Sequence, residues 1–205
     1  MSRSLFIAGV AIQRRLSAAL LCWLAACALL APAQATAADN IEITQAHLEA
    51  TDEGTKLSAT FALDLNRGLE DAITRGLTLS FTTDVEITRP RWYWFDQKAI
   101  VTSQTIKISY NFWTRHYQAT ISGSLQQNFN NLDDALSLVR RPRRWIVADK
   151  GALKTGETYN VAVRTALDVT QLSKPFQVNA LNNSDWRLSS DWKRFTYKAE
   201  KVDEK

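Results

Sequence analysis

The stretch Lys56-Leu57-Ser58-Ala59-Thr60-Phe61-Ala62-Leu63-Asp64-Leu65 alternates between apolar side chains and mostly polar ones. Successive side chains of a β-strand point to opposite faces, so Leu57, Phe61 and Leu63 share one face. A single apolar face is typical of an antiparallel sheet that packs on a core with one side and meets water with the other. The stretch therefore predicts a half-buried strand.

The same two-residue period recurs along most of the chain. It is found in residues 77–87, 106–112, 117–122 and 159–168. Two short segments, 69–73 and 132–139, instead have apolar residues at helical spacing, and Asn131 can cap the second of them. We therefore expect a mainly β protein, an antiparallel β-sandwich that is immunoglobulin-like in general architecture, with two short helices in connections.

The first 37 of the 205 residues are typical of a secretory signal peptide. Basic residues, including Arg14 and Arg15, precede an apolar run, and the small-residue segment Ala35-Thr36-Ala37 offers a cleavage site. We expect three parts: a cleaved leader at 1–37, one β-rich domain at 38–197, and a charged, disordered tail at 198–205. The predicted location is the periplasm of a Gram-negative cell. Two other interpretations are an uncleaved membrane anchor and a lipid anchor at Cys27.

Removing the leader changes which partners are plausible. Both cysteines, Cys22 and Cys27, lie in it, so the remaining domain has no disulfide and no thiol chemistry. The leader also holds three arginines and no acid, which leaves 22 basic residues against 21 acidic ones. A nearly neutral domain is a poor candidate for nucleic acid, whose binding depends on neutralising phosphates. Apart from the transient leader, we expect no contact with a membrane.

No motif for catalysis or for a cofactor is visible. His47 and His116 have no acidic or histidine neighbour at the spacing of a metal site, and we predict neither a metal nor a cofactor. The outer-face pair Asp84 and Glu86 fits the charged surface that keeps a sheet soluble. We therefore expect that the protein is not an enzyme.

Aromatic residues are the unusual feature of the sequence. Residues 89–96 read Arg-Pro-Arg-Trp-Tyr-Trp-Phe-Asp, and a second cluster contains Trp186 and Trp192, which with Leu188 share the parity of one final strand. Large aromatics mostly serve cores, so one interpretation is packing alone. The other is a site for a partner or ligand, because Trp and Arg are favoured at binding hot spots. The candidate binding residues are Arg89, Arg91, Trp92, Trp94, Trp186 and Trp192.

Several of these segments resemble one known family. Thr88–Lys98 resembles the signature of domain-of-unknown-function family 4390, a family of uncharacterised Gram-negative secreted proteins, sometimes labelled proline-rich signal peptide proteins. Further segments similar to the family's blocks are Ser109–Asn111, Thr114–Tyr117, Lys174–Leu181 and Ser184–Trp186. The similarity extends over residues 41–197, although Ser173 stands where a proline is common. The resemblance implies a periplasmic domain without accepted catalytic residues, so it assigns no site.

Three functions are compatible with the sequence. The first is a non-catalytic binding or interaction module of the cell envelope, whose partner is an envelope or inner-membrane protein. The second is a carrier of lipid or another apolar ligand, which requires a cavity between the sheets. The third is a hydrolase with dispersed carboxylates, which requires two carboxylates about 5–10 Å apart in a concave site.

Overall fold

The computed structural model describes residues 41–90, 97–142 and 144–200. Contacts divide the chain into residues 1–37 and residues 38–205 as separate units, and all of the described elements belong to the second. None of the helices in these ranges combines enough length with enough apolar character to cross a lipid bilayer.

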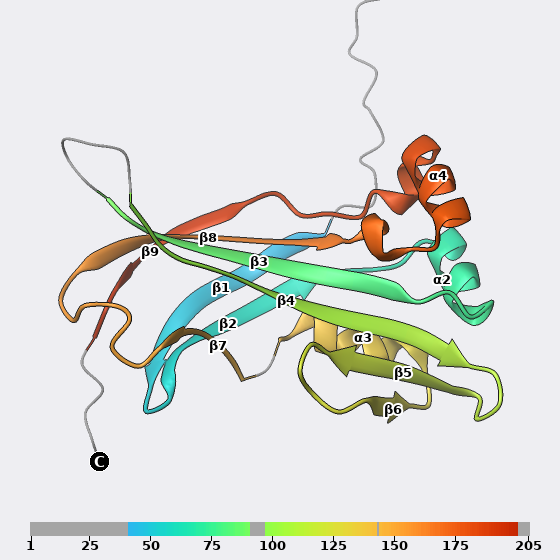
Figure 1. Ribbon diagram of the computed structural model, residues 1–205, viewed down its shortest axis with the longest axis horizontal. Coiled ribbons are helices and arrows are strands. Elements are labelled where there is room, and N and C mark those ends of the chain that lie inside the picture. Colours follow the sequence, from blue (N-terminus) through green and yellow to red (C-terminus); the bar gives the residue numbers. More distant parts are fainter. Residues whose placement is uncertain (1–40, 91–96, 143, 201–205) are drawn as a thin grey trace, which may run out of the picture. The chain divides into compact units, whose positions relative to one another are not determined.

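Two antiparallel sheets form the framework (Figure 1). The smaller sheet has the order β1-β2-β7, and the larger has the order β6-β5-β4-β3-β8-β9. The strands are β1 Glu42–Thr51, β2 Gly54–Ala62, β3 Leu79–Arg89, β4 Gln97–Asn111, β5 His116–Ile121, β6 Gln127–Phe129, β7 Trp145–Asp149, β8 Thr158–Leu167 and β9 Lys193–Lys198. The antiparallel sandwich expected from the alternation is confirmed. The strand order was not predicted from the sequence and comes from the structure.

Each predicted strand buries the expected face. Leu57, Phe61, Val85 and Val163 are each at most 1% exposed and join one core. Phe112 is an exception, since it follows the apolar parity of β4 but lies beyond the end of that strand and is exposed. β9 ends one residue beyond the domain boundary expected at 197, and Ala199 is buried.

Both predicted helices are present, and each begins at an asparagine cap. α2, Arg67–Thr74, begins after Asn66, whose Oδ1 accepts a hydrogen bond from the Leu69 amide at 3.0 Å. α3, Leu132–Arg140, begins after Asn131, whose Oδ1 accepts from the Asp134 amide at 2.7 Å. These bonds satisfy amides that have no partner inside the helix. The sequence reasoning missed a third helix, α4, Lys174–Asn182, and the 3₁₀ turns η1, Val169–Gln171, and η2, Ser184–Trp186.

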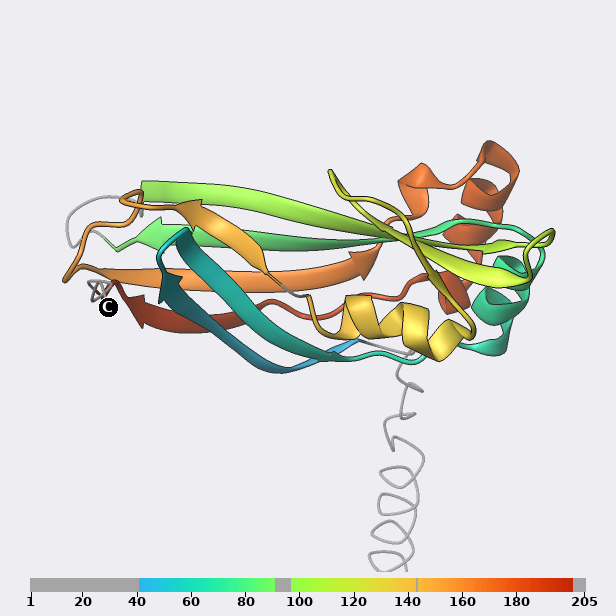
Figure 2. The ribbon, with the colours of Figure 1, turned by 90° about the horizontal axis from the view of Figure 1, so that it is seen from below.

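Among residues 41–90, 97–142 and 144–200, the elements that cover the middle of the larger sheet lie on one of its faces. β1, β2 and β7 lie on this face together with α3, which contacts β2, β4 and β5 (Figure 2). On β3, the side chains of Phe81, Val85 and Ile87 are buried beneath this cover. The intervening Asp84 and Glu86 point to the opposite, uncovered face and are only partly buried. This uncovered face contains the groove described below.

Candidate binding groove

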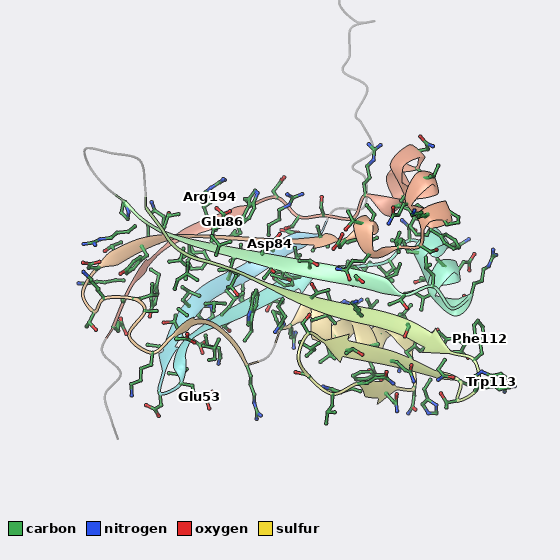
Figure 3. All side chains as sticks on the ribbon, in the orientation of Figure 1. Glu53, Asp84, Glu86, Phe112, Trp113 and Arg194 are labelled. Carbon is green, nitrogen blue, oxygen red and sulfur yellow. The ribbon has the colours of Figure 1, made fainter. Side chains whose placement is uncertain are left out.

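The uncovered face has a surface groove where β3, β8 and β9 lie side by side. Its volume is about 850 Å³. The residues that line it are Glu86, Thr88, Asn160, Val161, Ala162, Trp192, Arg194, Phe195 and Thr196. In Figure 3, Glu86 and Arg194 reach the same region near one end of the sheet, and Asp84 lies further along β3.

Sheet register explains why this region is hollow. Ala162 on β8 pairs with Glu86 on β3 and with Arg194 on β9. Asn160, two residues away on the same face of β8, pairs with Thr88 and Thr196. A methyl group at Ala162 lies between two long charged side chains, so it leaves a low floor with taller walls. The groove therefore depends on one small residue at the centre of a three-strand register.

The indole ring of Trp192 lies on this face and is paired with the guanidinium of Arg164. The guanidinium carbon of Arg164 lies 6.0 Å from the centre of the Trp192 ring, within the range of a cation–π contact. Arg164 Nε is buried and has no hydrogen-bond partner among the residues that the structure describes. A buried donor without a partner costs about 1–3 kcal/mol, so an acceptor group placed within reach of Arg164 Nε would be stabilised by this N–H.

The carboxylate of Asp84 shares this surface with Arg164, because the two residues are paired across β3 and β8. Burial raises the pKa of Asp84 above its usual value, and Arg164 opposes this shift while Glu86 and Asp168 reinforce it. The two carboxyl-bearing residues Asp84 and Glu86 are therefore crowded on one strand face. This outer-face position agrees with the sequence prediction.

The structure separates the predicted binding residues. Trp192 lines the groove, whereas Arg89 pairs with Glu157, with Arg89 Nη2 at 2.6 Å from Glu157 Oε1. Arg91, Trp92 and Trp94 belong to residues 91–96, which lie outside the described residues.

The expectation that Trp186 and Trp192 share a final strand is wrong. Trp186 lies in the 3₁₀ turn η2 and is buried, with its ring 6.2 Å from that of Phe176 on α4. It borders a different groove, between α2 and α4. Trp192 precedes β9 and belongs to the sheet face instead. Parity suggested a shared face, but the 3₁₀ turn interrupts the extended backbone on which parity depends.

Sequence reasoning missed Glu86, Ala162, Arg194 and Thr196 as site residues. Alternation assigned Glu86 to an outer face, but no local signal revealed that β9 would lie beside β8. Within residues 41–90, 97–142 and 144–200, no group of three His, Cys, Asp or Glu residues could hold a metal ion. The side chains present can instead supply stacking, hydrogen bonds and charges of both signs.

Comparison with known families gives one match. The model of the family described as "Domain of unknown function (DUF4390)" matches residues 38–196. The chain belongs to the DUF4390 family. No curated protein and no solved structure matches this DUF4390 chain. The groove is therefore described from its own geometry.

Proposed function

We propose that this protein is a non-catalytic binding module, exported to the periplasm, that recognises a segment of an envelope protein in the groove over β3, β8 and β9. The observation that carries the proposal is the juxtaposition of Trp192, Arg194 and Glu86 around the low floor at Ala162. Trp and Arg are the residues most often found at binding hot spots. Glu86 and Arg194 lie on strands of one continuous ladder, so little ordering of this backbone is needed when a partner binds.

The chemistry of the lining favours a polypeptide occupant. Arg194 can pair with a carboxylate of the partner. Asn160 and Thr196 can hydrogen-bond to a backbone, while the indole of Trp192 offers a flat apolar surface. A chain segment with one acidic and one apolar side chain fits this set.

A hydrolytic role has less support from this groove. Among its described lining residues, only Glu86 carries a carboxyl group. Asp84 is its neighbour on the same face of the same strand, so the two do not flank a cleft from opposite sides. A pair that activates water and protonates a leaving group requires such opposed positions.

Site-specific cross-linking in living cells tests the binding proposal. A photoreactive residue replaces Thr196, which is exposed in the groove, or Glu53, which is exposed at the β1–β2 turn far from it (Figure 3). We expect a discrete cross-linked protein from position 196 and none from position 53. Adding Arg194→Glu to the 196 variant should abolish the adduct. Equal adducts from both positions, or an adduct that persists with Arg194→Glu, would contradict the groove assignment.

Export is supported by a coincidence of boundaries. The DUF4390 match starts at residue 38, where the predicted leader ends. Cell fractionation and N-terminal sequencing of the chain test this part separately. We expect a periplasmic protein that begins at Ala38. A cytoplasmic protein that keeps residues 1–37 would disprove export without affecting the groove.

A further inference from the structure

The turn between β4 and β5 exposes two adjacent aromatic side chains. Trp113 is 96% exposed and Phe112 is 56% exposed, and both lie at the tip of the hairpin at one end of the larger sheet (Figure 3). A tryptophan that is almost fully exposed gains nothing from the protein's own core. The tip is also distant in register from the groove, which lies at the other end of β3.

The turn holds Trp113 outward by a specific set of contacts. Asn111 Oδ1 accepts hydrogen bonds from the Trp113 amide at 2.9 Å and from the Thr114 amide at 3.2 Å. The ring of Phe112 meets that of Tyr110 edge-on at 5.4 Å, and Tyr110 lies 5.0 Å from Tyr117. The tip is therefore ordered before any partner arrives, which lowers the entropic cost of inserting it.

Basic side chains occur in the turn and on the strand that leads into it. Between residues 97 and 132 the chain contains no carboxylate, Arg115 lies in the turn and Lys107 lies on β4, whereas Lys98 lies at the far end of β4 and is not near the tip. Arg115 belongs to the turn itself and is exposed. The neighbouring helix α2 adds Arg67 and Arg75 against Glu70 and Asp71, and so adds no net charge.

We propose that the β4–β5 tip docks the protein peripherally on an anionic lipid bilayer, with Trp113 and Phe112 in the interface and Arg115 at the headgroups. The tip projects aromatic side chains rather than enclosing a pocket, so its shape is suited to insertion among lipid headgroups. Tryptophan prefers the membrane–water boundary, and basic residues are attracted to anionic lipid. This contact goes beyond the expectation that only the leader meets a membrane, and it does not depend on the groove.

Flotation with vesicles tests the proposal. Residues 38–205, which form their own compact unit, are mixed with vesicles of phosphatidylglycerol or of phosphatidylcholine alone. Trp113→Ser is compared with Leu125→Ser, a matched control because Leu125 is 90% exposed at the β5–β6 turn. Both positions are solvent-exposed, so neither variant should change the thermal melt.

We expect the wild type to bind phosphatidylglycerol vesicles more strongly than phosphatidylcholine vesicles. Trp113→Ser should weaken partitioning roughly tenfold or more, and Arg115→Gln about fivefold at low salt. Leu125→Ser should bind like the wild type. The proposal is overturned if the wild type does not float with anionic vesicles, or if the two serine variants bind equally. A photoreactive residue at 113 that captures only protein in cells would also overturn it, and would assign the tip to a protein partner.

Discussion

The hydroxyl groups of Thr83 on β3 and Thr165 on β8 hydrogen-bond to each other at 3.0 Å inside the hydrophobic core. The Thr165 amide also donates to Ser190 Oγ at 3.0 Å. All three residues are buried, so this polar chain lies among apolar side chains. It ties the segment before β9 to the centre of the larger sheet.

We predict that the double substitution of this threonine pair costs less than the sum of the two single substitutions. Thr83→Val or Thr165→Val leaves the other hydroxyl with one partner fewer, at a cost of about 1–3 kcal/mol in the free energy of unfolding. Thr83→Val with Thr165→Val removes both hydroxyls and should cost less than the sum of the two. Urea denaturation of the four proteins measures the coupling. Additive losses would show that the hydroxyls do not interact energetically.

Filling the groove should abolish binding without changing stability. Ala162→Phe places a ring on the groove floor, and Ser103→Phe places the same ring on the same sheet face outside the groove. Cross-linking from position 196 should fall at least about tenfold with the first and stay unchanged with the second. Thermal melts of both variants should remain close to the wild type, because surface changes usually cost under about 0.5 kcal/mol. Undiminished cross-linking in Ala162→Phe would place the binding site elsewhere.

Asp84 should make stability fall as pH rises through its folded pKa. Burial raises the pKa of Asp84, so between the unfolded and folded pKa values the folded protein binds more protons than the unfolded one. The free energy of unfolding therefore decreases over that window and stays lowered above it. Asp84→Asn should be at least as stable as the wild type at pH 7, and this advantage should vanish below about pH 4.

Asp168 provides the opposite case for comparison. Burial alone would raise the pKa of Asp168, but hydrogen bonds from Thr170 and Gln171 outweigh it and lower the pKa. Asp168→Asn should therefore lose stability at pH 7, and the deficit should shrink as pH falls through the folded pKa. Denaturant titrations of both variants across pH measure the two signs. If both substitutions changed the free energy of unfolding at pH 7 in the same direction, the opposite pKa shifts given for Asp84 and Asp168 would be wrong.

Gly76 should tolerate alanine less well than Gly123 does. Both have positive φ, at +88° and +79°. A Cβ at Gly76 would lie 2.8 Å from Phe112 Cε2, whereas a Cβ at Gly123 would meet nothing within 4 Å. Gly123→Ala should cost about 1–2 kcal/mol from backbone strain alone, and Gly76→Ala should cost more. Chemical denaturation measures both. The excess should disappear when Phe112→Ala is added, and an excess that persists would point to another cause.

The sequence was sufficient to predict the elements whose own side chains decide their structure. Alternation predicted β2, β3, β5 and β8, and helical spacing predicted α2 and α3, with an asparagine cap predicted for α3 alone. α4 gave no such signal, since Phe176 and Val178 are exposed. Its formation depends on the surfaces that η1 and η2 present to it, as in the stacking of Phe176 on Trp186.

The groove could not be predicted, because it is a property of register between strands far apart in the chain. Glu86, Ala162 and Arg194 meet only because β8 pairs with both β3 and β9. An alanine on a polar face does not by itself indicate a groove, because the depth of the surface there depends on the side chains of its cross-strand neighbours. Trp192 was predicted for its residue type, but its partner Arg164 was not.

In the described part of the chain, the covering elements lie on a single side of the larger sheet, so alternate residues of its strands have different surroundings. Along β3, the odd-numbered positions from 81 to 87 are buried and contribute to the stability of the fold. The even-numbered positions from 82 to 88 are partly exposed and determine the chemistry of the sheet surface. Natural selection can therefore act on these two properties through interleaved residues of the same strand. Exchanges at the even-numbered positions therefore change the surface of the sheet and leave the interior untouched.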